Sequence, residues 1–389
     1  MTDGDAIWAG LDLGEEAARI CVIDNAGSVL LEADCSPEAN EITGVLSALP
    51  KAPFIGLEAG LGTRLTRQLR ASGLTVATFE VRTVRRFLSV FHNKTDASDA
   101  RGLAEIARLG RSVVSQVHVK TKECQVTRSL LAIRHKVTQQ RLATQSIIRS
   151  LFRVHAERTV RFSARLKVRA LVEEELQRLA SEGIDLRAEV LPLLSVWESL
   201  LQFGAAFDKR VAKMAKEIPT CRRLQTIPGV GPLLALSFYS AIEDPHRFAV
   251  TSRVGAYLGL APRLFKSGTV SRREGISKRG SKLTRTHLVI GAQVILRKDA
   301  QDSALKQWGT ALASRIGYRR ATIAVARKLA VLMLTIWKTE VDYMAFPREA
   351  AGSYLVKGEA LEPGRLSEAE PADSNRSDEP IAADRPVGH

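Results

Sequence analysis

The first eighty residues alternate short apolar runs with polar turns, and this order constrains the fold more than any other feature. Three strand-like runs come first, at 7–12, 19–24 and 28–31, with a hairpin turn expected at 25–27. The chain then alternates between the two element types, with helix at about 37–48, strand at 53–58, helix at about 62–72, strand at 74–79, and helices near 82–90 and 96–109. The sequence therefore predicts an α/β domain over residues 1–115.

Three strands followed by alternating helix and strand is the element order of an RNase H-like domain. After it, residues 116–220 carry two heptad-like seams that predict a helical, coiled-coil-like connector. The seams are Leu130, Ile133, Val137, Gln140, Thr144, Ile147, Leu151 and Val154, and then Val190, Leu193, Trp197, Leu200, Gly204, Phe207, Val211, Met214 and Ile218. An intramolecular helical hairpin and an oligomerising coiled coil both explain this spacing.

Residues 221–350 predict a mainly helical C-terminal domain, so the whole chain is expected to be α/β plus α. This domain opens with a glycine-containing turn at 227–231 and an apolar helix at 233–241, an arrangement that resembles a helix-hairpin-helix. In such a turn Gly229 and Gly231 let the backbone approach a phosphate. From 351 to 389 the chain turns to Pro, Ala, Ser and acids, which predicts a disordered acidic tail.

Charge indicates the class of partner. The chain has 57 Lys and Arg against 42 Asp and Glu, a net charge of +15. Residues 357–389 hold eight acids and four bases, net −4, so the rest of the chain carries +19. A body this basic implies a polyanion, and nucleic acid is a commoner partner than a membrane surface.

The sequence shows no sign of a membrane or secretory protein. No run approaches the ~18 uncharged apolar residues of a membrane span, and the N-terminus has no basic segment of a signal peptide. Cys21, Cys35, Cys124 and Cys221 are scattered without a paired spacing. This distribution argues against a disulfide framework and a zinc site, and it favours a reducing cytoplasm.

Four acids predict a metal centre. Asp12 and Glu58 each end a strand that reads as buried, and Asp96 and Asp99 share one helical face at i,i+3 spacing. Converging carboxylates repel one another unless a cation neutralises them. Mg²⁺ prefers such oxygen ligands, and two ions can stabilise both the attacking and the leaving oxygen at a phosphate. A helix N-cap is the alternative role for Asp96.

A basic segment predicts a second nucleic-acid contact. Between residues 263 and 285 there is one acid, Glu274, and glycines interrupt the run. The predicted phosphate contacts are Arg263, Lys266, Arg272, Arg273, Lys278, Arg279, Lys282 and Arg285.

Short motifs at both ends of the chain resemble one family. Asp12 lies in Gly-Leu-Asp-Leu-Gly, Glu58 in Gly-Leu-Glu-Ala-Gly, and Asp96 and Asp99 in Lys-Thr-Asp-Ala-Ser-Asp-Ala. These motifs, and the segment from Gly259 to 280, resemble the DEDD transposases of the insertion sequence 110 group. The resemblance covers about 6–110 and 222–300.

The resemblance implies a mechanism and partners. It implies a RuvC-like first domain and Ser267 as the nucleophile that becomes linked to a DNA phosphate; Ser271, Ser277 and Ser281 are the local rivals. It also implies a guide (bridge) RNA that pairs with donor and target DNA. A homo-oligomer, dimer or tetramer, would combine the acids of one subunit with the serine of another. The expected location is the bacterial cytoplasm, at the nucleoid.

Three other functions fit part of the sequence. A RuvC-like nuclease has the same acids but uses a metal-bound water and forms no covalent adduct. An actin-like ATPase or sugar kinase shares the glycine-rich hairpin at 10–14, although no second Asp-Gly-Gly phosphate motif follows. A basic nucleic-acid-binding scaffold would show salt-sensitive binding but would not need the acids.

Overall fold

The computed structural model describes residues 6–60, 62–89, 95–110, 114, 116–156, 160–163, 167–267 and 270–346, with the side chains of 264–274 left out. The expected acidic tail lies outside these residues. The chain forms two compact units, divided between Val126 and Thr127. Each unit has its own hydrophobic core.

The first unit contains the expected sheet. Its strands are β1 (Trp8–Leu13), β2 (Ala18–Ile23), β3 (Val29–Cys35), β4 (Phe54–Glu58) and β5 (Val76–Phe79). Their order is β3-β2-β1-β4-β5, in which β1 pairs antiparallel with β2 and parallel with β4, and β4 pairs parallel with β5. The predicted α/β class and all five strands are confirmed.

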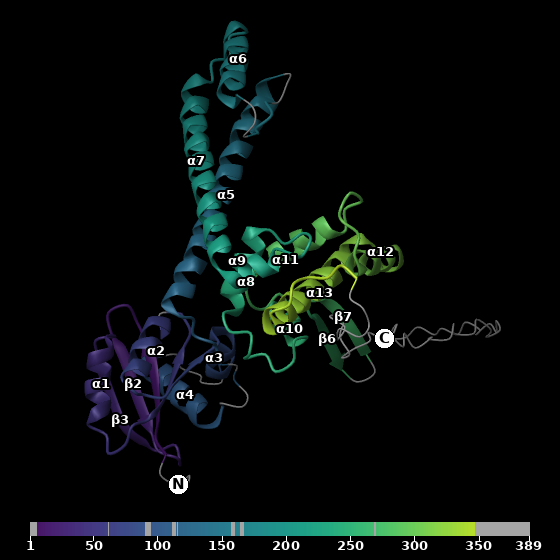
Figure 1. The fold of residues 1–389 in the computed structure, drawn as a ribbon. Coiled ribbons are helices and arrows are strands. Elements are labelled where there is room, and N and C mark those ends of the chain that lie inside the picture. Colours follow the sequence, from purple (N-terminus) through teal and green to yellow (C-terminus); the bar gives the residue numbers. More distant parts are fainter. Residues whose placement is uncertain are drawn as a thin grey trace, which may run out of the picture. The chain divides into compact units, whose positions relative to one another are not determined.

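Helices cover both faces of this sheet (Figure 1). The helices are α1 (Ala39–Ser47), α2 (Gly62–Ala71), α3 (Val81–Leu88) and α4 (Asp96–Leu109). Side chains of α1 and α2 pack with alternate strand residues such as Leu11 and Leu57, while α4 packs on the opposite face with Trp8 and Phe79. Period-2 alternation along the strands supplies an apolar surface to each layer.

Long helices open the second unit. They are α5 (Lys122–His155), α6 (Val168–Ser181) and α7 (Arg187–Glu217), and α5 and α7 lie side by side with α6 near their far end (Figure 1). The seam predicted on α7 faces inward, because Val190, Trp197 and Val211 are buried. The seam predicted on α5 differs, since Ile133 and Val154 are 50% and 75% exposed.

Helix α7 departs from the expectation that no segment of the sequence is apolar enough to span a membrane. By length and composition alone it could cross a membrane, with a window of mean hydropathy 1.4, of which 17% is buried. Its buried face packs in a helical cluster with Ile148 and Phe152 of α5 and Leu176 of α6. The apolar character of α7 therefore serves, in part, this packing.

The C-terminal helices share a second core. They are α8 (Pro219–Leu224), α9 (Pro232–Ile242), α10 (Arg253–Tyr257), α11 (Lys282–Ile295), α12 (Ala304–Ile316) and α13 (Tyr318–Thr339). The core includes Phe238, Leu288 and Met333, together with Leu131 of α5 and Val211 of α7. The N-terminal half of α5 and the C-terminal half of α7 therefore pack against the C-terminal helices.

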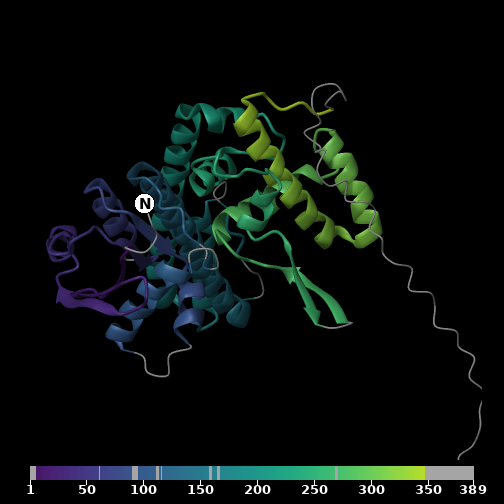
Figure 2. The same ribbon diagram turned by 90° about the horizontal axis from the view of Figure 1, so that it is seen from below.

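A hairpin not predicted from the sequence interrupts this helical region. Strands β6 (Pro262–Ser267) and β7 (Val270–Ile276) pair antiparallel, and Figure 2 shows them as a green ribbon that projects from the helices. The expectation of a mainly helical domain is correct in outline, but the basic stretch is β structure as far as Ile276, and Lys282 and Arg285 lie in α11. Strand pairing satisfies the backbone of this polar segment, which lacks the apolar stripe of a packed helix.

Candidate functional site

Two of the predicted acids lie at neighbouring strand ends. Leu11 of β1 pairs with Leu57 of β4, so Asp12 and Glu58 are the next residues on adjacent parallel strands. Both side chains are half-buried. Residues 11 and 57 belong to the core beneath α1 and α2, and alternation therefore places Asp12 and Glu58 on the opposite face, which α4 covers.

Two glycines allow α4 to approach this face closely. Gly10 and Gly56 pair with each other in the sheet, each two residues before an acid. A Cβ at Gly10 would lie 1.9 Å from the carbonyl oxygen of Ala100, and one at Gly56 would lie 2.9 Å from that of Leu103. The helix backbone therefore rests directly on the two strands. The same Gly-Leu-acid order contains both acids, at residues 10–12 and 56–58.

The direction of α4 follows from its contacts at the other end. Arg108 Nη1 donates to the carbonyl oxygen of Asn25 at 2.9 Å, in the turn between β2 and β3. That turn lies at the edge where β1 begins, because β2 runs antiparallel to β1. The first turn of α4, with Asp96 and Asp99, therefore points toward the edge where β1 and β4 end, next to Asp12 and Glu58.

A capping box fixes the start of α4. The Thr95 hydroxyl accepts from the backbone N–H of Ser98 at 3.1 Å, and the Ser98 hydroxyl accepts from that of Thr95 at 2.9 Å. Thr95 is thus the N-cap, and the alternative N-cap role for Asp96 is wrong. Asp96 is exposed and Asp99 half-buried in the first turn, where the helix dipole favours negative charge.

The four carboxylates share one face and one edge of the sheet, and oxygen donors of this kind suit a hard divalent cation. Among the residues that the structure describes, no three acidic, histidine or cysteine side chains lie close enough to hold an ion. The donor types fit a metal, and the arrangement is open.

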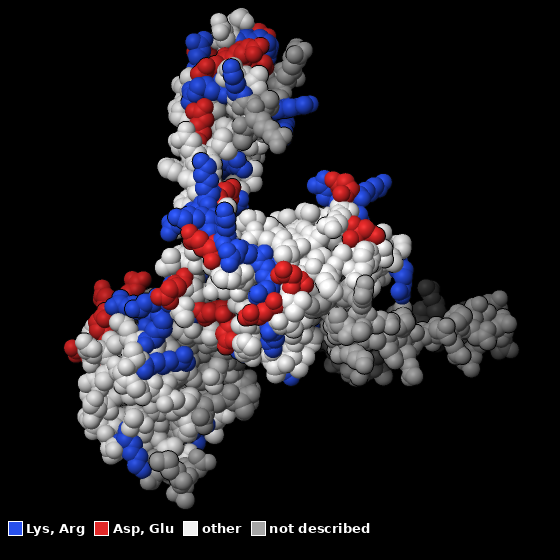
Figure 3. All heavy atoms as spheres, in the orientation of Figure 1, with Lys and Arg blue, Asp and Glu red and all other residues white. Residues whose placement is uncertain are grey.

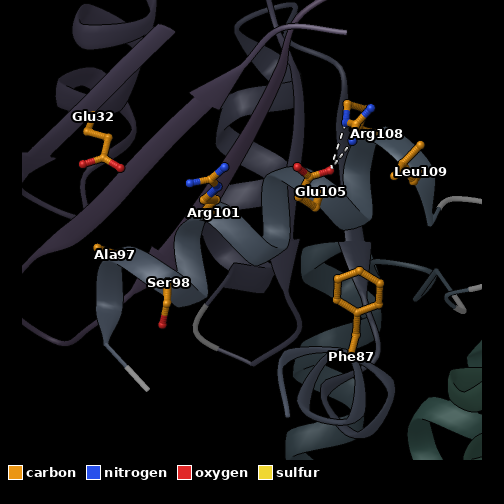
Figure 4. Close-up of a pocket in the computed structure, with 8 residues that line it drawn as sticks. All are labelled: Glu32, Phe87, Ala97, Ser98, Arg101, Glu105, Arg108 and Leu109. Carbon is orange, nitrogen blue, oxygen red and sulfur yellow. Dashed lines mark hydrogen bonds and ion pairs between the residues drawn. The ribbon is translucent and has the colours of Figure 1, made fainter. Parts of the chain in front are cut away.

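A hollow of about 660 Å³ lies on the outward side of α4 (Figure 4). Its lining includes Phe87, Ser98 and Arg101, and Arg108 forms an ion pair with Glu105 at 2.7 Å inside it. None of the four predicted acids lines the hollow. Both acidic and basic side chains line the hollow, so it differs in charge from the edge that carries the four acids.

In the second unit, the predicted nucleophile ends a strand. Ser267 is the last residue of β6, where its backbone pairs with Val270, and its side chain lies outside the described atoms. Of the rivals, Ser281 is the N-cap of α11 and accepts from the backbone N–H of Thr284 at 3.2 Å. The Ser277 backbone N–H donates to the carbonyl oxygen of Ala261 at 2.8 Å, at the base of the hairpin.

The predicted basic residues separate into two groups. Side chains of the first group are exposed around the hairpin base, namely Arg263, Lys278, Arg279 and Lys282. Arg285 is buried instead, and its Nη1 donates to the carbonyl oxygens of Leu258 at 3.0 Å and Arg279 at 2.9 Å. Burial lowers the pKa of Arg285. This geometry makes Arg285 a structural tie. The side chains of Lys266, Arg272 and Arg273 lie outside the described atoms.

The glycines of the predicted helix-hairpin-helix also differ from each other. The turn joins α8 to α9, and Gly229 adopts φ +83°, which favours glycine. A Cβ on Gly229 would lie 2.8 Å from the carbonyl oxygen of Gly291, so this residue faces α11. Gly231 has no neighbour within 4 Å of an added Cβ. Gly231 therefore leaves open space at the start of α9, while Gly229 is a packing residue.

Another basic surface was missed from the sequence. Lys209, Arg210, Lys213 and Lys216 are exposed on α7. In Figure 3 the blue side chains gather over the half of α7 that leads to α8, whereas acids and bases mix near α6. The signal was the helical spacing of residues 209, 213 and 216.

Two family models match the regions that carry the predicted site residues. Residues 9–155, which carry the four acids, match a transposase family of the DEDD, IS110 type. Residues 221–307, with the hairpin and α11, match the family described as "Transposase IS116/IS110/IS902 family". A transposase for insertion sequence element IS1111A from Coxiella burnetii is 31% identical over 86% of this chain and 90% of its own length. The chain belongs to the IS110 family of transposases.

Other relatives of this transposase match over a similar share of both chains. A probable family 20 transposase of Pseudomonas aeruginosa is 27% identical over 86% of this chain and 97% of its own length. The transposase for insertion sequence element IS1328 of Yersinia enterocolitica is 26% identical over 82% and 93%. The IS110 transposase described here is therefore a DNA-processing enzyme, and its DEDD family suggests the use of a divalent metal.

Proposed function

We propose that this transposase cuts and rejoins DNA strands by metal-dependent phosphoryl transfer in an RNase H-like first domain. The observation that supports it is the shared strand edge at β1 and β4, toward which the first turn of α4 points. The side chains proposed to hold two Mg²⁺ ions are Asp12, Glu58, Asp96 and Asp99. Bound there, such ions stabilise negative charge that develops on phosphate oxygens.

Ser267 is the proposed nucleophile. Its Oγ forms a bond to a DNA phosphorus while the bond from that phosphorus to one deoxyribose oxygen breaks. The serine proton leaves to a base, and the freed deoxyribose oxygen takes up a proton. Rejoining reverses these changes with the oxygen of a second strand. A serine hydroxyl is a poor nucleophile at neutral pH, so the activation of Ser267 is part of the proposal.

Exposed basic residues support DNA binding in this scheme. Arg263, Lys278, Arg279 and Lys282 lie around the base of the hairpin, whose first strand ends at Ser267. Such side chains neutralise backbone phosphates and release counterions. We propose that they hold the donor and target DNA strands near Ser267, and that a guide RNA pairs with the same strands.

A homo-oligomer completes the proposal. Ile133, Ile147 and Val154 are 50%, 48% and 75% exposed on α5, and 14- and 7-residue intervals place them on one heptad position. A second copy of α5 would cover this stripe, because identical heptad stripes are self-complementary. Exposed apolar stripes of this kind are typical of interaction surfaces.

The decisive experiment traps the covalent intermediate. Purified wild type is incubated with Mg²⁺, RNA transcribed from the non-coding ends of the element and a plasmid that carries those ends, and the products are separated under denaturing conditions. We expect a protein–DNA adduct for wild type and for the control Ser277→Ala, and none for Ser267→Ala. Strand cleavage without an adduct in wild type would instead identify a RuvC-like nuclease that uses water.

The metal site has its own test. We expect Mg²⁺ to raise the melting temperature of wild type, because an ion that binds only the folded state stabilises it. The shift should disappear in Asp12→Asn and persist in Glu38→Gln, which alters an exposed acid of the same unit. An unchanged shift in Asp12→Asn, with normal strand transfer, would remove the carboxylates from the mechanism.

A further inference from the structure

Helix α3 (Val81–Leu88) presents a ridge of three arginines to solvent. Arg82, Arg85 and Arg86 are exposed, and i,i+3 and i,i+4 spacing places them on one stripe of the helix. The opposite side is apolar, because Val84 is buried in the core beneath α4 and Leu88 packs against the same core. Packing of α3 therefore fixes the direction in which the three guanidinium groups point.

The partners of the other arginines in the first unit set this ridge apart. Arg19 and Arg64 form ion pairs, Arg67 and Arg70 donate to backbone carbonyl oxygens, and Arg108 does both. Within the described part of this unit, no ion pair or hydrogen bond involves the guanidinium groups of the three arginines of α3. Arg101, on α4, is the other described arginine of the unit without such a bond.

Three unpaired arginines on one short helix repel each other. Like charges at i,i+3 and i,i+4 destabilise a helix, and α3 has no acid in its first turn. The helix is eight residues long and depends on packing for its stability. An arrangement of this kind is stabilised by a polyanion, whose phosphates would occupy the space between adjacent guanidinium groups.

The position of α3 in the fold indicates which polyanion. Strand β5 lies parallel to β4, and Phe79 at its end pairs with Glu58. Helix α3 begins two residues later, at Val81, so it starts at the strand edge that carries Glu58 and Asp12. A strand whose phosphate reaches these carboxylates passes beside the start of α3.

We propose that the arginine ridge of α3, formed by Arg82, Arg85 and Arg86, binds the phosphodiester backbone of the DNA strand that enters the carboxylate edge. Each guanidinium group can form two parallel hydrogen bonds to a phosphate. Such contacts position the DNA strand and do not distinguish its bases. The ridge deepens the proposed function, since it names the group that holds substrate DNA at that same site.

The experiment measures binding rather than catalysis. A labelled 40-base-pair DNA duplex of random sequence is titrated with full-length wild type and with the triple variant Arg82→Gln, Arg85→Gln and Arg86→Gln over a range of salt concentrations. We expect the slope of log affinity against log salt to become shallower by about 2–3 in the triple variant, since each lost phosphate contact contributes about 0.9.

A second triple variant provides the matched control. Arg64→Gln, Arg187→Gln and Arg297→Gln remove the same charge from exposed arginines that already pair with acids, at 3.2, 3.4 and 2.7 Å. The control should keep the wild-type slope. A triple variant with Lys instead of Gln at the three α3 positions should have nearly the wild-type slope as well. Equal slopes for the two Gln triples would overturn the proposal, as would a loss seen with an RNA duplex of the same length but not with DNA.

The proposed DNA binding by the arginine ridge and the proposed cleavage chemistry can be tested separately. Asp12→Asn should abolish strand cleavage yet leave the salt slope of wild type. If Asp12→Asn cleaves normally while the α3 triple variant still loses slope, the chemistry is misassigned and the ridge stands. Melting temperatures close to that of wild type for both Gln triples would exclude unfolding as the cause.

Discussion

Replacing Gly10 by alanine tests whether the close approach of α4 positions the acids. The new Cβ would lie 1.9 Å from the carbonyl oxygen of Ala100 and 2.3 Å from the backbone nitrogen of Ala104. Ordinary contact begins at 3.4 Å, so the helix must retreat by about 1.5 Å. Both clashing atoms are backbone, so no side-chain rotation relieves them. Asp99 precedes Ala100 directly and moves with it.

Two effects of Gly10→Ala should follow. Overpacking of this kind lowers the free energy of unfolding by about 1–3 kcal/mol. Misplacement of a reacting group by about 1 Å can lower a rate by about 100-fold. We therefore expect a lower urea midpoint and a strand-cleavage rate that falls by about two orders of magnitude under conditions where the variant stays folded.

A second glycine provides the control for the first. Gly44 lies on the exposed side of α1, in the middle of the helix, and nothing is within 4 Å of an added Cβ. Gly44→Ala should stabilise the protein by up to about 1 kcal/mol and leave cleavage unchanged, since alanine is the better helix former. Wild-type stability and wild-type cleavage in Gly10→Ala would refute the reasoning. So would a destabilised variant whose folded fraction cleaves normally.

Other side chains give further expectations. Burial, with Arg134 and His135 nearby, lowers the pKa of His287 to about 4. The free energy of unfolding should therefore be highest above pH 6.5 and fall by up to about 3 kcal/mol as the pH drops to about 4. Urea unfolding across this range should show that fall in wild type and not in His287→Leu. Arg285→Met leaves the buried carbonyl oxygen of Leu258 and the partly buried one of Arg279 without their donor, and it should lower the free energy of unfolding by about 1–3 kcal/mol in the same assay. Thr95→Ala removes the capping box of α4 and should lower the melting temperature, with a loss of about 1 kcal/mol.

The sheet of the first unit could be predicted because its strands are short apolar runs with clear turns between them. Asp12 and Glu58 end such runs, so their shared edge was within reach of the sequence. The approach of α4 was not, because the α4 residues that contact Gly10 and Gly56 come more than 45 positions later in the chain. Tertiary contacts of a glycine leave no trace in local propensity.

The basic region shows a different limit. Strands β6 and β7 were missed because residues 262–276 carry charges where a buried strand would carry apolar side chains. Counting charge also grouped Arg285 with surface residues. Its spacing from Leu288, Ala292 and Ile295 puts it on the buried face of α11, and that periodicity was a usable signal.

The two halves of the carboxylate set are each fixed before they meet. Hydrogen bonds between β1 and β4 hold Asp12 and Glu58 at a constant spacing, and one turn of α4 does the same for Asp96 and Asp99. Direct contact of the α4 backbone with Gly10 and Gly56 then fixes the position of one pair relative to the other. In the proposed metal centre, most of the entropic cost of placing the ligands would therefore fall on the folding of the domain instead of on the binding of an ion.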